Sequence, residues 1–249
     1  MCRRMLLTLE YDGTAYAGWQ RQLNGPSIQQ ELERALHKLT GEAVGVTGAS
    51  RTDAGVHALG QRAHFDTASR IPDDKWPFAL NTLLPHDIRV VDSQPVGGAF
   101  HARFDARGKT YVYRFYNRRQ PSALLRHYTA HAPLSLREDA MERAARHLLG
   151  LHDFAAFQAA GGTAKTTIRQ IDQAALRREG EEIHLTVHGN AFLYNMVRII
   201  AGTLLSIGVG KLPEDAFLRA FDTGDRLQLG PTAPAQGLCL VRVDYEGLR

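Results

Sequence analysis

Apolar and polar residues alternate in several stretches of this chain, and strict alternation is typical of half-buried β-strands. The clearest run spans residues 108–117, where Tyr111, Tyr113 and Phe115 share one face and Thr110, Val112, Arg114 and Tyr116 share the other. Shorter runs of the same kind predict further strands at residues 5–11, 44–47, 60–65, 88–94, 183–188 and 238–245.

Other stretches repeat their apolar residues at the spacing of a helix. Ser27 and Gln30 form a capping box, and the apolar positions that follow predict a helix ending near Thr40. Ser135 and Glu138 have the spacing of a second capping box, which predicts a helix that Gly150 ends. Proline positions and apolar runs predict three more helices, over residues 77–84, from Phe192 to about residue 209, and 213–221.

Strand, helix and strand follow one another in both halves of the chain. We therefore expect an α/β (α+β) fold of two related domains, covering residues 1–105 and 106–249 and joined near residues 97–106. Several strands are adjacent in sequence, so the sheets should be mostly antiparallel, with helices on one face.

Composition narrows the class of protein. The 249 residues include 44% apolar residues, enough for a substantial core. There are 30 Lys and Arg against 26 Asp and Glu, a net charge of +4, and the isoelectric point near 9.2 mildly favours a polyanionic partner such as nucleic acid. Cys2 and Cys239 lie at opposite ends, which supports neither a disulfide framework nor a zinc knuckle and fits a reducing cytosol.

Several other classes of site find no support. The apolar run at residues 192–209 contains Asn195 and Arg198, so it predicts a buried helix rather than a membrane span. No Walker or dinucleotide glycine pattern follows a strand, so we expect no nucleotide cofactor. His57, His64 and His101 lack the spacing of metal ligands, and we expect no metal.

The loop at residues 48–58, GASRTDAGVHA, has the composition of a functional site. Small residues allow close approach of a backbone or ligand, and the Arg51 guanidinium lies within reach of the Asp53 carboxylate, which it would keep ionised. An ionised, fixed carboxylate can act as a nucleophile. The alternative is that Asp53 caps a turn, the commonest task of Asp in a glycine-rich loop.

Basic and aromatic residues interleave in the middle of the chain, which suggests a groove for nucleic acid. Arginine and lysine can neutralise phosphates while aromatic rings stack on unpaired bases. The alternative is that Tyr111, Tyr113 and Phe115 are the core face of a strand with solvated charges at its edges. The basic candidates for substrate binding are Arg103, Arg107, Lys109 and Arg114.

Five segments in order together resemble the tRNA pseudouridine synthase A family. They are YDGTAYAGWQ (11–20), RTDAGVHA (51–58), FHARFDARGKTYVYRFYN (100–117), FLYNMVRIIAGTLL (192–205) and TAPAQGLCLVRVDY (232–245). The resemblance runs end to end. It implies a two-domain pseudouridine synthase fold with a central RNA-binding cleft, and a cytoplasmic, dimeric, cofactor-free enzyme. Such an enzyme isomerises uridines at positions 38, 39 and 40 of the tRNA anticodon stem-loop.

The resemblance also assigns roles to residues. The Asp of RTD corresponds to Asp53, as nucleophile, and its Arg to Arg51. The family's tyrosine, arginine and leucine correspond to Tyr111, Arg198 and Leu238. Ser50 departs from the family pattern, since many relatives have Gly before the Arg; the change could alter the stiffness of the loop but leaves the chemical groups intact.

Those residue types suit the chemistry of pseudouridine formation, which detaches uracil at N1 and rejoins it through C5. A carboxylate can carry the intermediate covalently, by attack on either C1′ or C6, and the sequence does not choose between them. Tyr111 would stack on the flipped base or accept the C5 proton, Leu238 would pack against its other side, and Arg198 would pair with Asp53. Arg51 would occupy the vacated stack.

Two alternatives stay open on the sequence alone. One is a pseudouridine synthase of the same superfamily that acts on another RNA, and the other is a non-catalytic RNA-binding or chaperone protein. For the tRNA enzyme we expect a homodimer, because the anticodon stem-loop and the elbow of one tRNA extend beyond a single domain.

Overall fold

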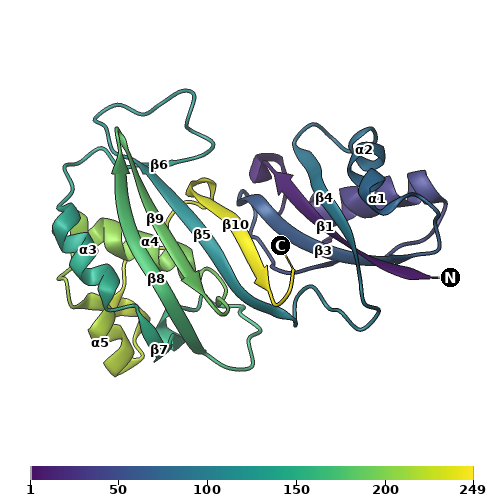
Figure 1. The fold of residues 1–249 in the computed structure, drawn as a ribbon. Coiled ribbons are helices and arrows are strands. Elements are labelled where there is room, and N and C mark those ends of the chain that lie inside the picture. The colour runs from purple at the N-terminus through teal and green to yellow at the C-terminus, as the bar shows by residue number, and fades with distance from the viewer. Residues whose placement is uncertain (1, 249) are drawn as a thin grey trace. The chain divides into compact units, whose positions relative to one another are not determined.

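The computed structural model describes residues 2–248, which divide into two compact units. The first contains the described residues up to Arg107 together with those from Cys239 onward, and the second is Gly108–Leu238. Each unit combines helices with mostly antiparallel strands (Figure 1). The expected α/β class is therefore confirmed.

A five-stranded sheet forms the body of the first unit. Its strands are β1 (Arg3–Tyr11), β2 (Thr47–Gly48), β3 (His57–Thr67), β4 (Ile88–Val96) and β10 (Leu238–Tyr245). Their order is β4-β1-β3-β10, with β2 on β3. All pairs are antiparallel except β3 with β10, in which Cys239 lies opposite His57.

Two helices accompany this sheet, α1 (Ile28–Thr40) and α2 (Trp76–Asn81). The α1 helix begins as its sequence predicts, because the Ser27 hydroxyl accepts a hydrogen bond from the Gln30 amide at 3.3 Å. Its apolar stripe is buried, with Leu32 and Leu36 fully enclosed. Short 3₁₀ helices occupy Gly13–Ala15 and Asp73–Lys75.

The second unit has a sheet of the order β5-β9-β8-β7, antiparallel throughout, with β6 parallel to β5. The strands are β5 (Ala106–Tyr116), β6 (Ala130–His131), β7 (Gly150–Asp153), β8 (Ile168–Glu179) and β9 (Glu182–Gly189). On one face, the buried residues Tyr111, Tyr113 and Phe115 lie opposite Val187, Leu185 and Ile183. This face is the core of the unit.

Three helices group on one side of β8 and β9 in Figure 1: α3 (Glu138–Arg146), α4 (Met196–Gly208) and α5 (Ala216–Thr223). The α4 helix is buried along most of its length, as its apolar sequence predicts. Across residues 2–248, no helix is both long enough and apolar enough to cross a bilayer. Short 3₁₀ helices occupy Ala155–Phe157, Arg226–Gln228 and Ala235–Gly237.

Several element boundaries differ from the sequence predictions. The strand expected at residues 44–47 is Thr47–Gly48, because only these two residues pair with β3. The Ser135 capping box does not form, since α3 begins at Glu138 after Arg137 and has no side-chain cap. The helices expected from Pro77, Phe192 and Pro213 are α2, α4 and α5 with shifted ends. Strands β6, β7 and β8 were not predicted.

The division of the chain also differs from the expected boundary between residues 105 and 106. The first unit extends to Arg107, and the final strand from Cys239 returns to it. The reason is the pairing of β10 with β3, a contact between residues that lie about 180 positions apart in sequence. No local sequence pattern reports such a pairing.

Candidate active site

Asp53 lies in the loop that connects β2 to β3 in the first unit. Its side chain is half-buried, and its carbonyl oxygen accepts a hydrogen bond from the Val56 amide at 3.1 Å. Gly55 completes this turn at φ +78°, a conformation that favours glycine. This turn is closed by the Asp53 backbone, and the Asp53 residue stays partly open to solvent.

A buried polar cluster holds the residues just before Asp53. The Gln61 side chain, fully buried on β3, accepts a hydrogen bond from the Ser50 amide at 3.2 Å and donates one to the Ser50 carbonyl at 2.6 Å. It also donates to the Tyr11 hydroxyl at 3.4 Å, and that hydroxyl lies 2.8 Å from the Thr52 hydroxyl. Because satisfied buried networks are rigid, this cluster fixes the loop immediately before the carboxylate.

Segment 11–20 touches the loop through its backbone. The Trp19 amide donates to the Thr52 carbonyl at 3.0 Å, and a β-carbon at Gly18 would lie 2.5 Å from the same oxygen. A β-carbon at Gly13 would collide with the Val56 carbonyl. The two glycines therefore permit an approach that no other residue allows.

His57 closes the other end of the loop. Its Nδ1 atom accepts a hydrogen bond from the Gly13 amide at 3.1 Å and lies 3.2 Å from Asp12 Oδ1. Asp12 Oδ1 in turn accepts from the Thr14 amide at 2.9 Å, which caps the short 3₁₀ helix after β1. The loop is thus held both before and after Asp53.

Arg51 does not behave as its spacing suggests. Its side chain is exposed, and within residues 2–248 the structure records no ion pair between its guanidinium and the Asp53 carboxylate. Arg51 therefore has its guanidinium available at the surface.

Tyr111 comes from the second unit, where β5 holds it on the core face. Only 5% of its surface is exposed, and its ring meets Phe192 edge to face with centroids 5.1 Å apart. Tyr113, two residues on, is fully buried and donates its hydroxyl to the Pro234 carbonyl at 2.7 Å. Burial raises the pKa of Tyr113 above its usual range, so its hydroxyl stays protonated and keeps this contact.

Arg198 lies in the first turn of α4 and is tied to the loop before β10. Its Nε donates to the Ala233 carbonyl at 2.8 Å, and its own carbonyl accepts from the Ala233 amide at 3.0 Å. Its Nη1 donates to Asn195 Oδ1 at 2.7 Å. Asn195 adopts φ +62°, so a left-handed residue begins the helix and presents this oxygen. Arg198 is therefore fixed in position.

Leu238 is the first residue of β10 and is 6% exposed. The preceding loop packs closely on α4 and β5. A β-carbon at Gly202 would collide with the Pro231 carbonyl, and one at Gly237 would lie 2.6 Å from the Tyr113 ring. The loop that carries Ala233 thus places Leu238 in the same part of the second unit as Arg198 and the β5 tyrosines.

The four basic candidates are divided between the two units, with Arg103 and Arg107 in the first and Lys109 and Arg114 in the second. Lys109 and Arg114 are half-buried, and because five positions separate them along the regular strand β5 they lie on opposite faces. Arg107 is exposed and pairs with Glu246 at 3.0 Å. Arg103 is exposed in the turn before β5. Tyr113 and Phe115 are core residues, as the alternative interpretation of this stretch holds.

Sequence reasoning missed the residues that anchor the loop. Gln61 shares a strand face with Ala63 and Phe65, both fully buried. A glutamine on an apolar strand face needs hydrogen-bond partners within the core. Its place among apolar residues was therefore the sequence feature that could have indicated the anchoring role of Gln61. Within residues 2–248, no group of three or more His, Cys, Asp and Glu side chains could hold a metal ion.

The first unit holds the chain on either side of Asp53, and the second unit buries Tyr111 and holds the Arg198 guanidinium. The tRNA pseudouridine synthase family model matches residues 8–105 and 144–246, which include Asp53 and Arg198 but not Tyr111. The chain belongs to the tRNA pseudouridine synthase family. Enzymes of this family convert uridine to pseudouridine, so the chain is an isomerase.

Relatives of this family match over nearly the whole chain. The tRNA pseudouridine synthase A of Acetivibrio thermocellus is 50% identical over 243 residues, covering 98% of this chain and 100% of the relative. That of Ruminiclostridium cellulolyticum is 50% identical over 244 residues, with the same coverage. The tRNA pseudouridine synthase A 2 of Clostridium perfringens is 46% identical over 243 residues, again with 98% and 100% coverage.

A solved structure of a Cbf5-Nop10-Gar1 complex contains a chain with a TM-score of 0.43 and 11% identity, covering 95% of this chain and 48% of that one. At this level of similarity, the family assignment rests on the family model and the sequence relatives.

Proposed function

We propose that this family member isomerises uridine to pseudouridine at positions 38, 39 and 40 of the tRNA anticodon stem-loop, with Asp53 as the nucleophile. The observation that carries the proposal is the Asp53 loop itself. Its carboxylate is half-buried, and buried contacts from Gln61 and His57 hold the chain on either side of it. A turn cap alone needs no such support, whereas a nucleophile must be held in position for attack.

The reaction breaks the N1–C1′ bond, turns the uracil and joins C5 to C1′, while C5 loses a proton and N1 gains one. The Asp53 carboxylate carries the intermediate covalently, at C1′ of the sugar or at C6 of the base. In the first case the detached base must be held, and in the second the base stays attached to the enzyme. Both routes leave a proton to be removed from C5.

We assign the remaining roles to residues whose local positions suit them. Tyr111 brings a ring that stacks on the flipped base and a hydroxyl that accepts the C5 proton. Leu238 packs against the other side of the base, and Arg198 pairs with the Asp53 carboxylate. Arg51, exposed and without an ion pair to Asp53 within residues 2–248, fills the stack that the flipped uridine leaves.

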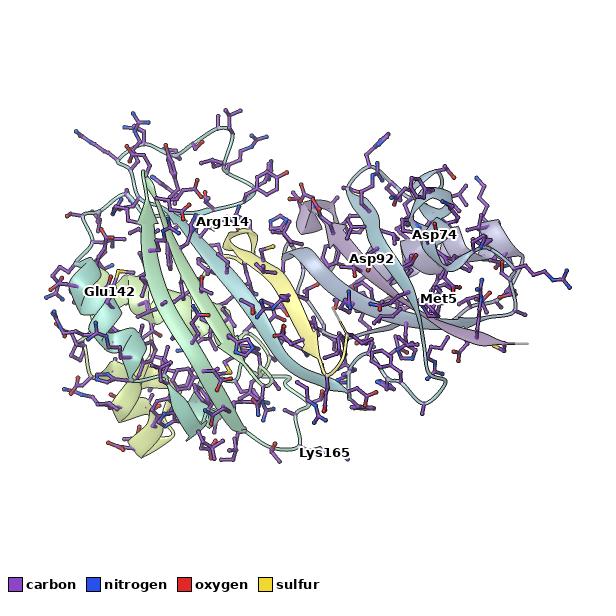
Figure 2. All side chains as sticks on the ribbon, in the orientation of Figure 1. Met5, Asp74, Asp92, Arg114, Glu142 and Lys165 are labelled. Carbon is purple, nitrogen blue, oxygen red and sulfur yellow. The ribbon has the colours of Figure 1, made fainter. Side chains whose placement is uncertain are left out.

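Replacing Asp53 with asparagine tests the chemistry. Asp53→Asn keeps the size of the side chain but removes the charge, so single-turnover pseudouridine formation should fall at least about 10³-fold while tRNA affinity and thermal unfolding stay close to normal. Asp92→Asn makes the same chemical change at an exposed position on β4 (Figure 2) and should leave all three measurements unchanged. Near-normal turnover by Asp53→Asn would show that Asp53 is not the nucleophile and serves only in the turn.

Mapping the product tests the substrate. Unmodified tRNA transcripts incubated with the protein should gain pseudouridine at positions 38, 39 and 40, and transcripts with cytidine at these positions should gain none. Pseudouridine elsewhere in tRNA, or only in another RNA, would identify a synthase with a different substrate. Tight tRNA binding without any pseudouridine would identify a binding protein.

We further propose that the protein works in the cytoplasm as a homodimer in which both chains contact one tRNA, at its anticodon stem-loop and elbow. One chain of 27.6 kDa is too small to reach both of these parts of a tRNA at once, so a second chain would contact the part that the first does not. Light scattering at working concentration should therefore give about twice this mass. A strictly monomeric and fully active protein would refute this assembly.

A further inference from the structure

The turn at residues 101–105 in the first unit is closed by side chains at both ends. The His101 amide donates to Asp105 Oδ2 at 2.8 Å, and the amides of Phe104 and Asp105 donate to the His101 carbonyl at 3.1 Å and 3.0 Å. His101 Nδ1 accepts from the amides of Arg103 and Phe104 at 3.2 Å and 3.3 Å. Because these bonds define each residue's place, the turn is a rigid element.

Buried contacts attach this turn to the sheet. The Ala102 amide donates to His64 Nδ1 on β3 at 3.1 Å, and the Tyr245 hydroxyl on β10 donates to the Ala102 carbonyl at 2.6 Å. Burial lowers the pKa of His64 to about 4, so its Nδ1 remains an acceptor at neutral pH. Phe100 packs on Tyr245, with ring centroids 5.1 Å apart. The turn therefore stands on a fixed base.

Phe104 projects from this fixed turn into solvent. Its side chain is 74% exposed, although one face of its ring stacks on His101 with centroids 4.2 Å apart and planes inclined by 26°. The Arg103 guanidinium lies 5.8 Å from the centroid of the same ring. Among residues 2–248 no ion pair is recorded for Arg103, so its charge is not committed to a carboxylate. An exposed aromatic ring beside an uncommitted cation is the combination that single-stranded RNA uses.

A second exposed phenylalanine shows what is distinctive about Phe104. Phe78 is 71% exposed, and Lys75 Nζ lies 5.4 Å from its ring centroid. However, Lys75 pairs with Asp74 at 3.0 Å, and no ring contact is recorded for Phe78 among the described residues. Of these two phenylalanines, only Phe104 has a ring that stacks on another ring and a neighbouring cation, Arg103, for which no ion pair is recorded among the described residues.

The turn that carries Phe104 and the loop that carries Asp53 are attached to β3 at different points along the strand. His57 joins the strand at the loop, and His64, which holds the turn, follows seven residues later. Seven strand residues at about 3.3 Å each span about 23 Å. A base at Phe104 therefore cannot be the base that Asp53 attacks.

We propose that Phe104, backed by His101 and flanked by Arg103, is a stacking site for an unpaired base of the RNA substrate, separate from the uridine that reacts. The site rests on the proposed function for the identity of the RNA. A protein partner is the other occupant to consider, but a single ring among the charged residues Arg103 and Asp105 is far from the several hundred square ångströms of contiguous apolar surface that mark protein interfaces. Arg103 supplies the charge that a neighbouring phosphate would neutralise.

Binding of RNA to the full chain tests the site. The probes are a single-stranded oligouridine octamer with one 2-aminopurine, whose fluorescence is quenched on stacking, and an unmodified tRNA transcript. Phe104→Ala should weaken binding of both probes roughly 5- to 150-fold, equivalent to about 1–3 kcal/mol, and should reduce the quenching. Phe104→Tyr should bind as the original protein does, because its ring still stacks. Thermal unfolding of each variant verifies that it is folded.

Phe78→Ala is the matched control, and it should leave RNA binding unchanged. Equal losses for Phe78→Ala and Phe104→Ala, or no loss for Phe104→Ala, would overturn the proposal. Unchanged RNA binding with dissociation of the protein into monomers would overturn it in favour of contact with a second copy. The quenching also separates this proposal from the catalytic one, because the signal should persist in Asp53→Asn and would remain measurable even if no pseudouridine formed.

Discussion

Replacing Gln61 with leucine removes the buried amide that holds the loop before Asp53, without touching Asp53 itself. Leucine fills much of the same volume, so the change acts mainly through hydrogen bonds. Three bonds to the loop and its neighbour are lost: from the Ser50 amide at 3.2 Å, to the Ser50 carbonyl at 2.6 Å, and to the Tyr11 hydroxyl at 3.4 Å. The Ser50 backbone thereby loses two hydrogen bonds in a buried place.

The size of the effect follows from those two lost bonds. Each hydrogen bond contributes about 0.5–1.5 kcal/mol, so the free energy of unfolding should fall by about 1–3 kcal/mol. At roughly 2–4 °C for each kcal/mol, Tm should fall by roughly 2–12 °C. If the loop relaxes to satisfy Ser50 elsewhere, Asp53 moves with it. A displacement of about 1 Å in a reacting group costs roughly 10²-fold in rate.

Single-turnover pseudouridine formation per folded molecule, measured well below the lowered Tm, separates these effects from simple unfolding. Thr67→Val is the control, because it removes buried hydrogen bonds to Glu42 and Ser69 at the opposite end of β3. We expect the Thr67→Val protein to lose stability and keep its turnover, and the Gln61→Leu protein to lose roughly 10- to 100-fold in turnover with tRNA affinity retained. Equal turnover of the two variants would show that Gln61 only fills the core.

Three further outcomes are expected. Gly202→Ala should destabilise the second unit by about 1–3 kcal/mol in chemical denaturation, because its β-carbon meets the rigid Pro231 carbonyl, while Gly208→Ala on the same helix should cost less, since it meets the flexible Met141 side chain. Burial lowers the pKa of His64 from 6.5 to about 4, so as pH falls the unfolded chain is protonated at this residue at a higher pH than the folded chain. The free energy of unfolding should therefore drop by about 2 kcal/mol from pH 7.5 to 5. His64→Asn should lose this dependence on pH, as measured by urea titrations. Tyr111→Phe should keep tRNA affinity but lose single-turnover rate, whereas Tyr111→Ala should lose both.

Local sequence patterns predicted the elements whose stability is itself local or strongly periodic. The Ser27 cap forms because its partner lies three residues away, and the buried Tyr111, Tyr113 and Phe115 recur at every second position of β5. Strand β8 escaped prediction because, of its twelve residues, only Ile171 is buried. Its register is set by pairing with β9 and β7, and a strand with a single buried residue carries no period that reports this.

In the candidate site, too, local sequence features could be predicted and contacts between distant segments could not. The composition of residues 48–58 and the charge of Asp53 are visible in the sequence, and so is the resemblance that assigns them a role. The contacts of Gln61 are not visible, because they join β3 to β1 and to the loop through the folded sheet. The exposure of Phe104 is hidden as well, since a phenylalanine flanked by Arg103 and Asp105 has no periodic partner to indicate which way it points.

The contacts around Asp53 explain why segment 11–20 and the loop at 48–58 occur together although only one of them carries the carboxylate. Gly13 and Gly18 allow the first segment to reach the carbonyls of Val56 and Thr52, and Gly48 allows the loop to reach the Trp19 ring. Each contact needs a glycine on one side and a fixed backbone or ring on the other. The first segment therefore supplies backbone contacts that hold the loop. A substitution at any of these glycines would move the backbone around Asp53, the proposed nucleophile.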